Sequence, residues 1–114
     1  MENTINIKEL NLERCLKIRN FSYIKYAEKL EVLNLRETDV TDISFLAKNK
    51  CLKKLYLTSC HNIIDFSYIK NCKKIEILIL DDTNIDDISF LENNSNINYL
   101  NLSHSKNIKD YSYI

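Results

Sequence analysis

The sequence predicts one α/β domain over residues 1–114, built as a solenoid. A five-stranded parallel sheet would form one face, and short helical or 3₁₀ turns would form the other. Two observations predict this fold: one pattern recurs every 22 or 23 residues, and each copy begins with a two-residue alternation of leucines. Repetition at this period is typical of solenoids.

The repeats are visible by direct comparison of segments. Residues 30–46, LEVLNLRETDVTDISFL, return as residues 75–91, IEILILDDTNIDDISFL, with nine of seventeen positions identical. A longer form at residues 52–69 recurs at 97–114 and more loosely at 7–24. The chain therefore contains five copies, here called units 1 to 5, which start at Ile7, Leu30, Leu52, Ile75 and Ile97.

Each unit opens with the pattern apolar-x-x-Leu-x-Leu. The paired leucines are Leu10 and Leu12, Leu33 and Leu35, Leu55 and Leu57, Leu78 and Leu80, and Leu100 and Leu102. A period of two indicates a strand with one buried face. One strand per unit, always in the same direction, stacks into a parallel sheet.

A small polar residue follows the strand of every unit, where the turn begins: Cys15, Thr38, Cys60, Thr83 and Ser105. Such side chains are suited to bonding backbone groups that the sheet no longer pairs. Glycine and proline are absent, so the turns fall to Asn, Asp, Ser and Lys. Asn tolerates the left-handed conformation best among these four.

The second half of each unit carries an Asp or Asn before a short apolar group. These residues are Asn20, Asp42, Asp65, Asp87 and Asp110. The pattern predicts an N-cap followed by a short helix or 3₁₀ turn. Its inward side chains would be Phe21 and Ile24, Ile43 and Leu46, Phe66 and Ile69, Ile88 and Leu91, and Tyr111 and Ile114. Asn49 and Asn94 are expected to bond backbone in the turn that returns to the next strand.

The full pattern resembles the leucine-rich repeat, specifically the 22-residue type of bacterial internalins and of a protein-phosphatase regulatory subunit. The resemblance extends over residues 7–114. It implies a right-handed solenoid that recognises a partner protein on the concave face of its sheet. Two features depart from the family: Cys, Thr or Ser replaces the usual strand-exit Asn, and the convex segment always carries an aromatic residue where Pro is common. The aromatic residues are Tyr23, Phe45, Tyr68, Phe90 and Tyr113.

The concave face is the first candidate site. Alternation places the residues beside the paired leucines in solvent. Contiguous exposed apolar surface with aromatic anchors marks contact sites. The predicted protein-binding residues are Val32, Asn34, Arg36, Lys54, Tyr56, Thr58, Ile77, Ile79, Asp81, Tyr99 and Asn101. The competing interpretation is that these residues only favour strands.

Two further surfaces are weaker candidates. The convex aromatic row is interpreted as a structural ladder, with a second interface as the alternative. Charges sum to zero but separate in the chain: lysines at positions 48, 50, 53, 54, 70, 73 and 74 gather where it enters the strands, and acidic residues 37, 39, 81, 82 and 86 where it leaves. This separation of charges has three interpretations: the charged faces are simply solvated, they steer a partner, or the lysines bind RNA or another polyanion.

Catalysis and metal binding have little support in the sequence. The four cysteines have no C-x-x-C spacing, and Cys15 and Cys60 lie two units apart, too far to bridge. His61 and His104 have no recurring nucleophile or carboxylate, so we expect surface histidines. We therefore predict no cofactor, no metal, no catalytic residues and no enzyme activity.

The preferred hypothesis is a non-enzymatic protein-interaction module that binds an unidentified partner. The alternative is a structural protein that dimerises through uncapped solenoid ends, or a fragment of a longer array, because residues 1–6 are too short and polar for a capping helix and residues 97–114 lack a return turn. Nucleic-acid and membrane partners are not expected. Free thiols and the lack of a signal or membrane-spanning segment predict the cytoplasm.

Overall fold

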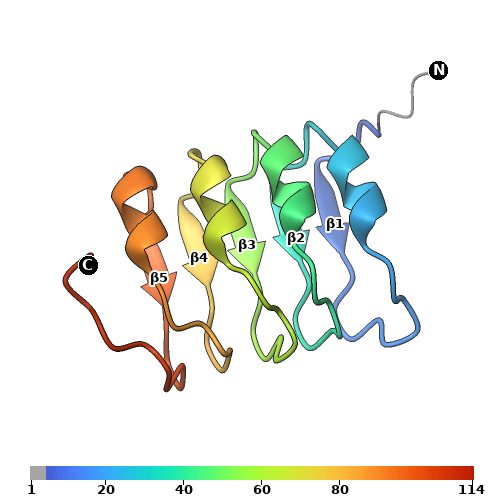
Figure 1. Ribbon diagram of the computed structural model, residues 1–114. Coiled ribbons are helices and arrows are strands. Elements are labelled where there is room, and N and C mark those ends of the chain that lie inside the picture. The colour runs from blue at the N-terminus through green and yellow to red at the C-terminus, as the bar shows by residue number, and fades with distance from the viewer. Residues whose placement is uncertain (1–4) are drawn as a thin grey trace.

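The computed structural model describes residues 5–114 and shows a curved stack of five similar coils (Figure 1). One parallel sheet has the order β1-β2-β3-β4-β5. Its strands are β1 Glu9–Asn11, β2 Val32–Asn34, β3 Lys54–Tyr56, β4 Ile77–Ile79 and β5 Tyr99–Asn101. The opposite face carries the 3₁₀ helices η1 Ser22–Tyr26, η2 Ser44–Lys48, η3 Ser67–Asn71 and η4 Ser89–Asn93. The predicted solenoid is confirmed.

The leucines stack in register, and this stack forms the core beneath the sheet. Leu33 pairs with Leu10 on one side and with Leu55 on the other, and the same register continues to units 4 and 5. The leucines of the three inner strands are fully buried, whereas Leu10 and Leu100 on the edge strands are half-buried. An inner strand has a neighbour on both sides, and an edge strand has only one.

Left-handed residues occur where each strand ends, and none of them is Asn. Arg14, Glu37, Ser59, Asp82 and His104 have φ between 55° and 60°. The conformation turns the backbone N–H toward the next unit: Glu37 N donates to the Thr58 carbonyl at 2.9 Å, and Asp82 N to the Ser103 carbonyl at 2.8 Å. These hydrogen bonds offset a left-handed cost of about 1–2 kcal/mol.

Four of the five small polar residues after the strands bond buried carbonyls, as predicted; for Cys15 of unit 1 no such bond is seen within residues 5–114. The Thr38 hydroxyl and the Cys60 thiol both donate to the Leu35 carbonyl, each at 2.9 Å. The Thr83 and Ser105 hydroxyls donate to the Leu80 carbonyl in the same way, at 2.9 and 2.8 Å. Each carbonyl is shared by an even unit and the odd unit after it, which agrees with the two-unit period of 45 residues in the sequence.

The predicted N-cap position was wrong by one residue, because the 3₁₀ helices are directly preceded by Phe21, Ile43, Phe66 and Ile88, which make no side-chain cap hydrogen bond. The predicted Asp and Asn residues lie one position earlier and still bond the start of each turn. In all five units the side-chain Oδ1 accepts the backbone N–H of the serine two residues later, at 2.8–2.9 Å. Asn20 and Asp42 show the same bond, so charge is not required for it. These bonds hold the chain at the start of each convex turn.

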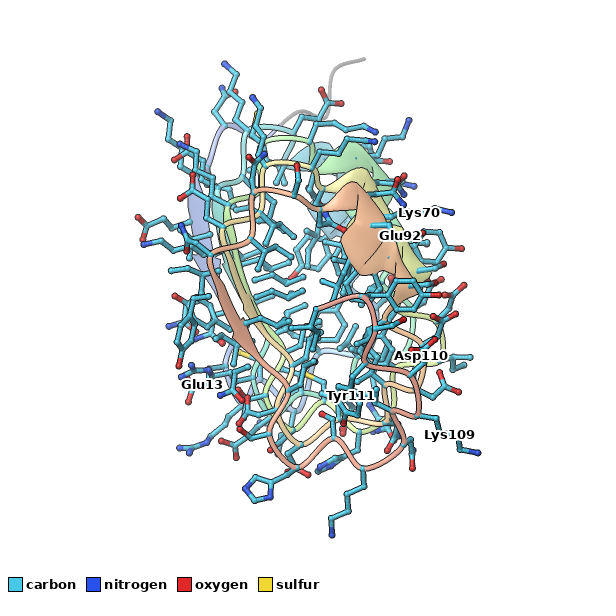
Figure 2. All side chains as sticks on the ribbon, turned by 90° about the vertical axis from the view of Figure 1, so that its left-hand side faces the viewer. Glu13, Lys70, Glu92, Lys109, Asp110 and Tyr111 are labelled. Atoms are coloured by element: carbon cyan, nitrogen blue, oxygen red, sulfur yellow. The ribbon has the colours of Figure 1, made fainter. Side chains whose placement is uncertain are left out.

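Most of the predicted inward side chains on the convex side are buried, but those of unit 5 are not. Tyr111 is 52% exposed and Ile114 is 72% exposed. Figure 2 views the molecule from this end and labels Tyr111. Residues 112 and 113 form a turn rather than a 3₁₀ helix, and no further convex segment among residues 5–114 covers them. The prediction of inward packing was wrong for these two residues.

The convex aromatic row belongs largely to the core. Phe45 and Phe90 are buried, Tyr68 and Tyr113 are half-buried against the core, and Tyr23 is more exposed. This burial supports a structural role for the row. Ile5 packs partly on the other end of the core and donates its N–H to the Tyr26 carbonyl.

The two buried return-turn asparagines bond backbone of the preceding unit. Asn49 Nδ2 donates to the carbonyls of Ile24 and Ala27, at 3.1 and 3.0 Å. Asn94 Nδ2 makes the equivalent bonds one pair of units later. The expected role in the return turn is confirmed.

Candidate protein-binding face

One hollow on the concave face gathers most of the predicted binding residues. It has a volume of about 440 Å³. Eight of the eleven predicted residues line it: Arg36, Tyr56, Thr58, Ile77, Ile79, Asp81, Tyr99 and Asn101. We call these eight residues the concave hollow. Val32, Asn34 and Lys54 belong to strands β2 and β3 but are not among its lining.

The floor of the concave hollow is apolar and its sides are aromatic. Ile79 is only 6% exposed, so its expected solvent exposure was wrong. It lies between Tyr56 and Asn101 in the sheet register, so it has a neighbouring side chain on both sides. Tyr99 remains 56% exposed, while Tyr56 and Ile77 are half-buried. Tyr99 is therefore the most accessible apolar side chain of the hollow.

The positively charged side chain of Arg36 lies at the unit 2 side of the concave hollow and is held in place there. The Arg36 guanidinium lies over the Tyr56 ring, 4.8 Å from its centroid. The Arg36 backbone N–H donates to Asn34 Oδ1 at 3.0 Å. Its Nε is buried and has no acceptor among residues 5–114. Ring stacking therefore holds a cation whose donors are not all used.

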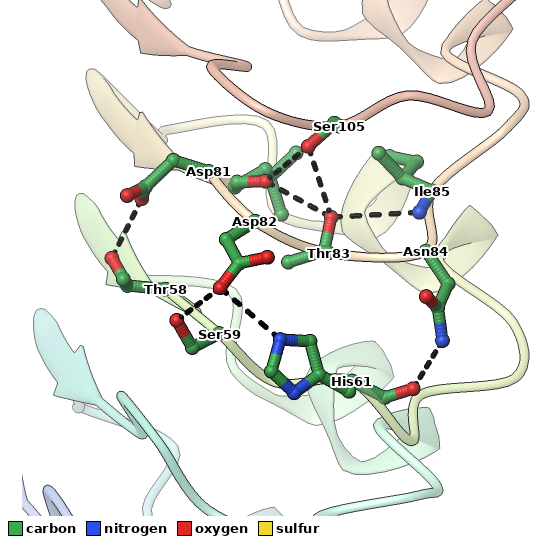
Figure 3. Close-up of polar contacts among 10 residues, drawn as sticks. Thr58, Ser59, His61, Asp81, Asp82, Thr83, Asn84, Ile85 and Ser105 are labelled. Carbon is green, nitrogen blue, oxygen red and sulfur yellow. Dashed lines mark hydrogen bonds and ion pairs between the residues drawn. The ribbon is translucent and has the colours of Figure 1, made fainter.

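The carboxylate of Asp81 lies at the unit 4 side of the concave hollow and is held in place there. Asp81 Oδ1 accepts a 2.7 Å hydrogen bond from the Thr58 hydroxyl (Figure 3). Asp81 and Arg36 occupy the same place in units 4 and 2, about 10 Å apart if strands are spaced by about 4.8 Å. They form no ion pair within residues 5–114. The hollow thus has opposite charges at two corners.

Two predicted binding residues have structural tasks. Asn34 Oδ1 and Asn101 Oδ1 accept the backbone N–H of the residue two positions later, and Asn11 does the same in unit 1. Tyr56 and Ile79 replace this Asn in units 3 and 4. The hollow is therefore apolar in units 3 and 4, where Tyr56 and Ile79 take the place of the Asn that recurs in the other units.

A polar cluster at the strand exits was not expected from the sequence. Asp82 Oδ2 accepts a hydrogen bond from Ser59 Oγ at 2.7 Å and contacts His61 Nε2 at 3.1 Å (Figure 3). The Ser59 bond, and then the His61 bond, lowers the pKa of the Asp82 carboxyl. The signal that could have found the cluster is its spacing of about one repeat, 23 and 21 residues.

This cluster does not have the geometry of a catalytic triad. In a triad the imidazole takes the proton of the nucleophile, whereas here Ser59 bonds the carboxylate directly. Both His61 and Asp82 are more than half exposed. Their contact is a surface ion pair when His61 is protonated, and such pairs contribute little to stability.

Comparison with known proteins agrees with the geometry. The family described as leucine rich repeats (2 copies) matches residues 28–71. The chain has the leucine-rich-repeat fold. Comparison of its sequence with curated proteins gives no match.

Two internalins of Listeria monocytogenes share the fold of this chain. The internalin inlF has a TM-score of 0.70 and 25% identity, over 85% of this chain and 28% of its own. Internalin C2 has a TM-score of 0.77 and 24% identity, over 90% of this chain and 50% of its own. The present chain therefore spans half or less of the length of these relatives. The leucine-rich repeat is typical of protein-interaction modules.

A second hollow, about 480 Å³ in volume, lies along the convex turns of units 3 and 4. Its carboxylates include Asp65 and Asp87, whose Oδ1 atoms accept the N–H groups of Ser67 and Ser89 at 2.8 Å. Hydrogen bonds from the side chain and backbone of Ser67 lower the pKa of Asp65, and those from the backbone and side chain of Ser89 lower the pKa of Asp87. Both carboxylates are engaged in capping, so the second hollow is a weaker candidate than the concave one.

Neither a metal cluster nor a spanning helix is found within residues 5–114. No three or more His, Cys, Asp or Glu side chains there are placed to hold a metal ion. None of the helices in this range has the length and apolar character to cross a bilayer. The four cysteines are free thiols.

Proposed function

We propose that the chain is a non-enzymatic interaction module that binds a partner protein through the concave face, with units 3 to 5 carrying most of the contact. The observation that supports this most is the concave hollow itself, since residues from four consecutive units converge on it. Convergence of Tyr56 and Tyr99 on a buried apolar floor is the arrangement that interface anchors require.

The test is capture of a partner by the intact chain and by a double variant, Tyr56→Ala with Tyr99→Ala. We expect the captured partner, once identified, to bind the double variant at least 10-fold more weakly, because aromatic anchors each contribute about 2 kcal/mol or more at such sites. Affinity is measured by titration calorimetry, and folding by circular dichroism.

The matched control removes two tyrosines from the convex side, Tyr23→Ala with Tyr26→Ala. These are 38% and 37% exposed. The control is expected to bind like the unmodified chain. Equal binding by the Tyr56/Tyr99 variant, or equal loss in both double variants, would contradict the concave face as the binding surface.

The chain is further proposed to work in a reducing cytoplasm. Cys60 and Cys72 are buried, and burial raises the pKa of the Cys72 thiol to about 12, which keeps it protonated and inert. Imaging of the tagged chain in its host tests the location, and accumulation outside the cytoplasm would argue against it.

Self-assembly is the second candidate. In unit 5 the side chains of Tyr111 and Ile114 are exposed, and Leu100 and Leu102 are only half-buried. Apolar surface of this kind is often covered in an oligomer. Light scattering at increasing concentration tests it. A monomer throughout, for the native chain and for Ile114→Asp alike, would exclude this candidate.

A further inference from the structure

We propose that the concave hollow recognises an extended partner segment that carries a carboxylate for Arg36 and, two residues away, an apolar side chain for the floor at Ile79. This inference rests on the proposed binding of a protein at the concave face. It adds the chemistry of the segment that is bound. The argument uses three parts of the hollow: its cation, its floor and its carboxylate.

The cation is held in place before any partner arrives. The Arg36 guanidinium stacks on Tyr56 at 4.8 Å, and its backbone is tied to Asn34. The ion pairs formed within residues 5–114 are Arg14 with Glu37 and His61 with Asp82, so Arg36 takes part in none. A stacked guanidinium with unused donors suits a carboxylate, which it can bind through two parallel N–H bonds.

The apolar floor at Ile79 lies close enough to the Arg36 guanidinium for one extended segment to reach both. Arg36 covers Tyr56, and Tyr56 is paired in register with Ile79 on the next strand. The anion position and the apolar floor are therefore roughly 5–10 Å apart, one to two strand spacings. In an extended segment, residues i and i+2 point to the same side and are about 7 Å apart. This match determines the proposed two-residue spacing.

The carboxylate of Asp81 sets the direction of the segment. It lies two units from Arg36 in the same row and is oriented by Thr58. A second acidic side chain placed there would meet an unpaired negative charge, and a basic one would be favoured. Repulsion of this kind provides specificity as much as attraction does. The acidic residue of the segment therefore points toward unit 2 and not toward unit 4.

The test selects octapeptides from a random displayed library on the immobilised intact chain and measures their affinities by fluorescence polarisation. We expect the selected peptides to carry Asp or Glu two residues from Leu, Ile, Phe or Tyr. Arg36→Gln is expected to weaken them at least 10-fold, and Glu→Gln in the peptide to weaken binding equally. The two changes combined should cost no more than either alone.

Two controls separate recognition from folding. Arg14→Gln removes another arginine at a strand exit, outside the hollow, and is expected to change affinity less than twofold. Arg36→Lys keeps the charge but loses the planar fork, so intermediate weakening is expected. Thermal unfolding midpoints of the variants, compared with the native chain, show that the fold is retained.

The outcomes distinguish this inference from the proposed function. If Tyr99→Ala weakens peptide binding and Arg36→Gln does not, the proposed binding at the concave face is retained, but the proposed contact between Arg36 and a carboxylate of the segment is wrong. Enrichment of basic peptides, or no selected peptide, also overturns the segment chemistry. If neither variant has any effect on the selected peptides, the concave hollow itself is not the binding site.

Discussion

Five residues in the left-handed conformation connect this chain's local geometry to its sheet. They are chemically unrelated, yet each lies two residues after the second of the paired leucines of its unit. The repeat therefore selects the backbone conformation and leaves the side chain free. Where the next unit accepts the hydrogen bond, as for Glu37 with Thr58, the local cost is offset. This arrangement explains how a chain without glycine makes five tight turns.

At His104 the left-handed cost can be removed. His104→Gly is expected to raise the free energy of unfolding by roughly 0.5–1 kcal/mol. Glycine removes the left-handed penalty of about 1–2 kcal/mol, but it also increases the entropy of the unfolded chain, which cancels part of the gain. Urea unfolding measures the change. Lys106→Gly, in the same turn but without positive φ, is expected to destabilise the chain. Stabilisation by both variants would rule out this explanation.

At the scale of the element, each convex turn depends on one side-chain oxygen. Backbone and side-chain hydrogen bonds from Ser44 lower the pKa of the Asp42 carboxyl, and those from Ser67 lower that of Asp65. A depressed folded-state pKa contributes stability that is present above the unfolded value, near 4, and is lost as the pH falls through the lower folded value. Acid should therefore weaken the turns of units 2 to 5 but not the Asn20 turn.

Replacement of the acids by asparagine tests this dependence. Asp42→Asn with Asp65→Asn keeps an acceptor for the serine N–H groups, as Asn20 does in unit 1, but removes the titration. We expect stability between pH 4 and pH 2, measured by urea unfolding, to fall less steeply than in the native chain. The exposed pair Glu28→Gln with Glu92→Gln serves as the control. An unchanged slope in the Asp variant would show that the caps do not titrate as proposed.

For the whole molecule, stability depends on stacking, since each unit contacts mainly its neighbours. The core is continuous through units 2 to 4 and opens to solvent at both ends of the sheet. Leucines at the same position in different units therefore contribute different amounts to the free energy of unfolding. Leu55 is fully buried between two strands, and Leu100 is half-buried on the edge strand.

Truncation at these two positions makes the difference measurable. Leu55→Ala is expected to lower the free energy of unfolding by about 2–5 kcal/mol, because it leaves a cavity between rigid neighbours. Leu100→Ala should cost less, since its site is already partly solvated and has one neighbouring strand. Both are measured by urea unfolding. Equal losses would mean that the edge unit is as tightly packed as the centre.

The candidate site could be predicted only in outline. Alternation beside Leu55, Leu78 and Leu100 was enough to place Tyr56, Ile77 and Tyr99 on one face, because period and register are local properties of a repeat. The shielding of Ile79, the stacking of Arg36 on Tyr56 and the meeting of Ser59, His61 and Asp82 were not predicted. Each depends on side-chain directions between units, which no single unit encodes.

The sequence by itself determined the five coils, the strand faces, the capped turns and the buried polar ladder, because all of these follow from a period that stacks identical positions. Only the tertiary structure decided which concave residues enclose a hollow and which support the backbone. The reason is physical: side chains of different size meet across neighbouring units, and their contacts depend on the distance and direction between the units rather than on the pattern inside each one.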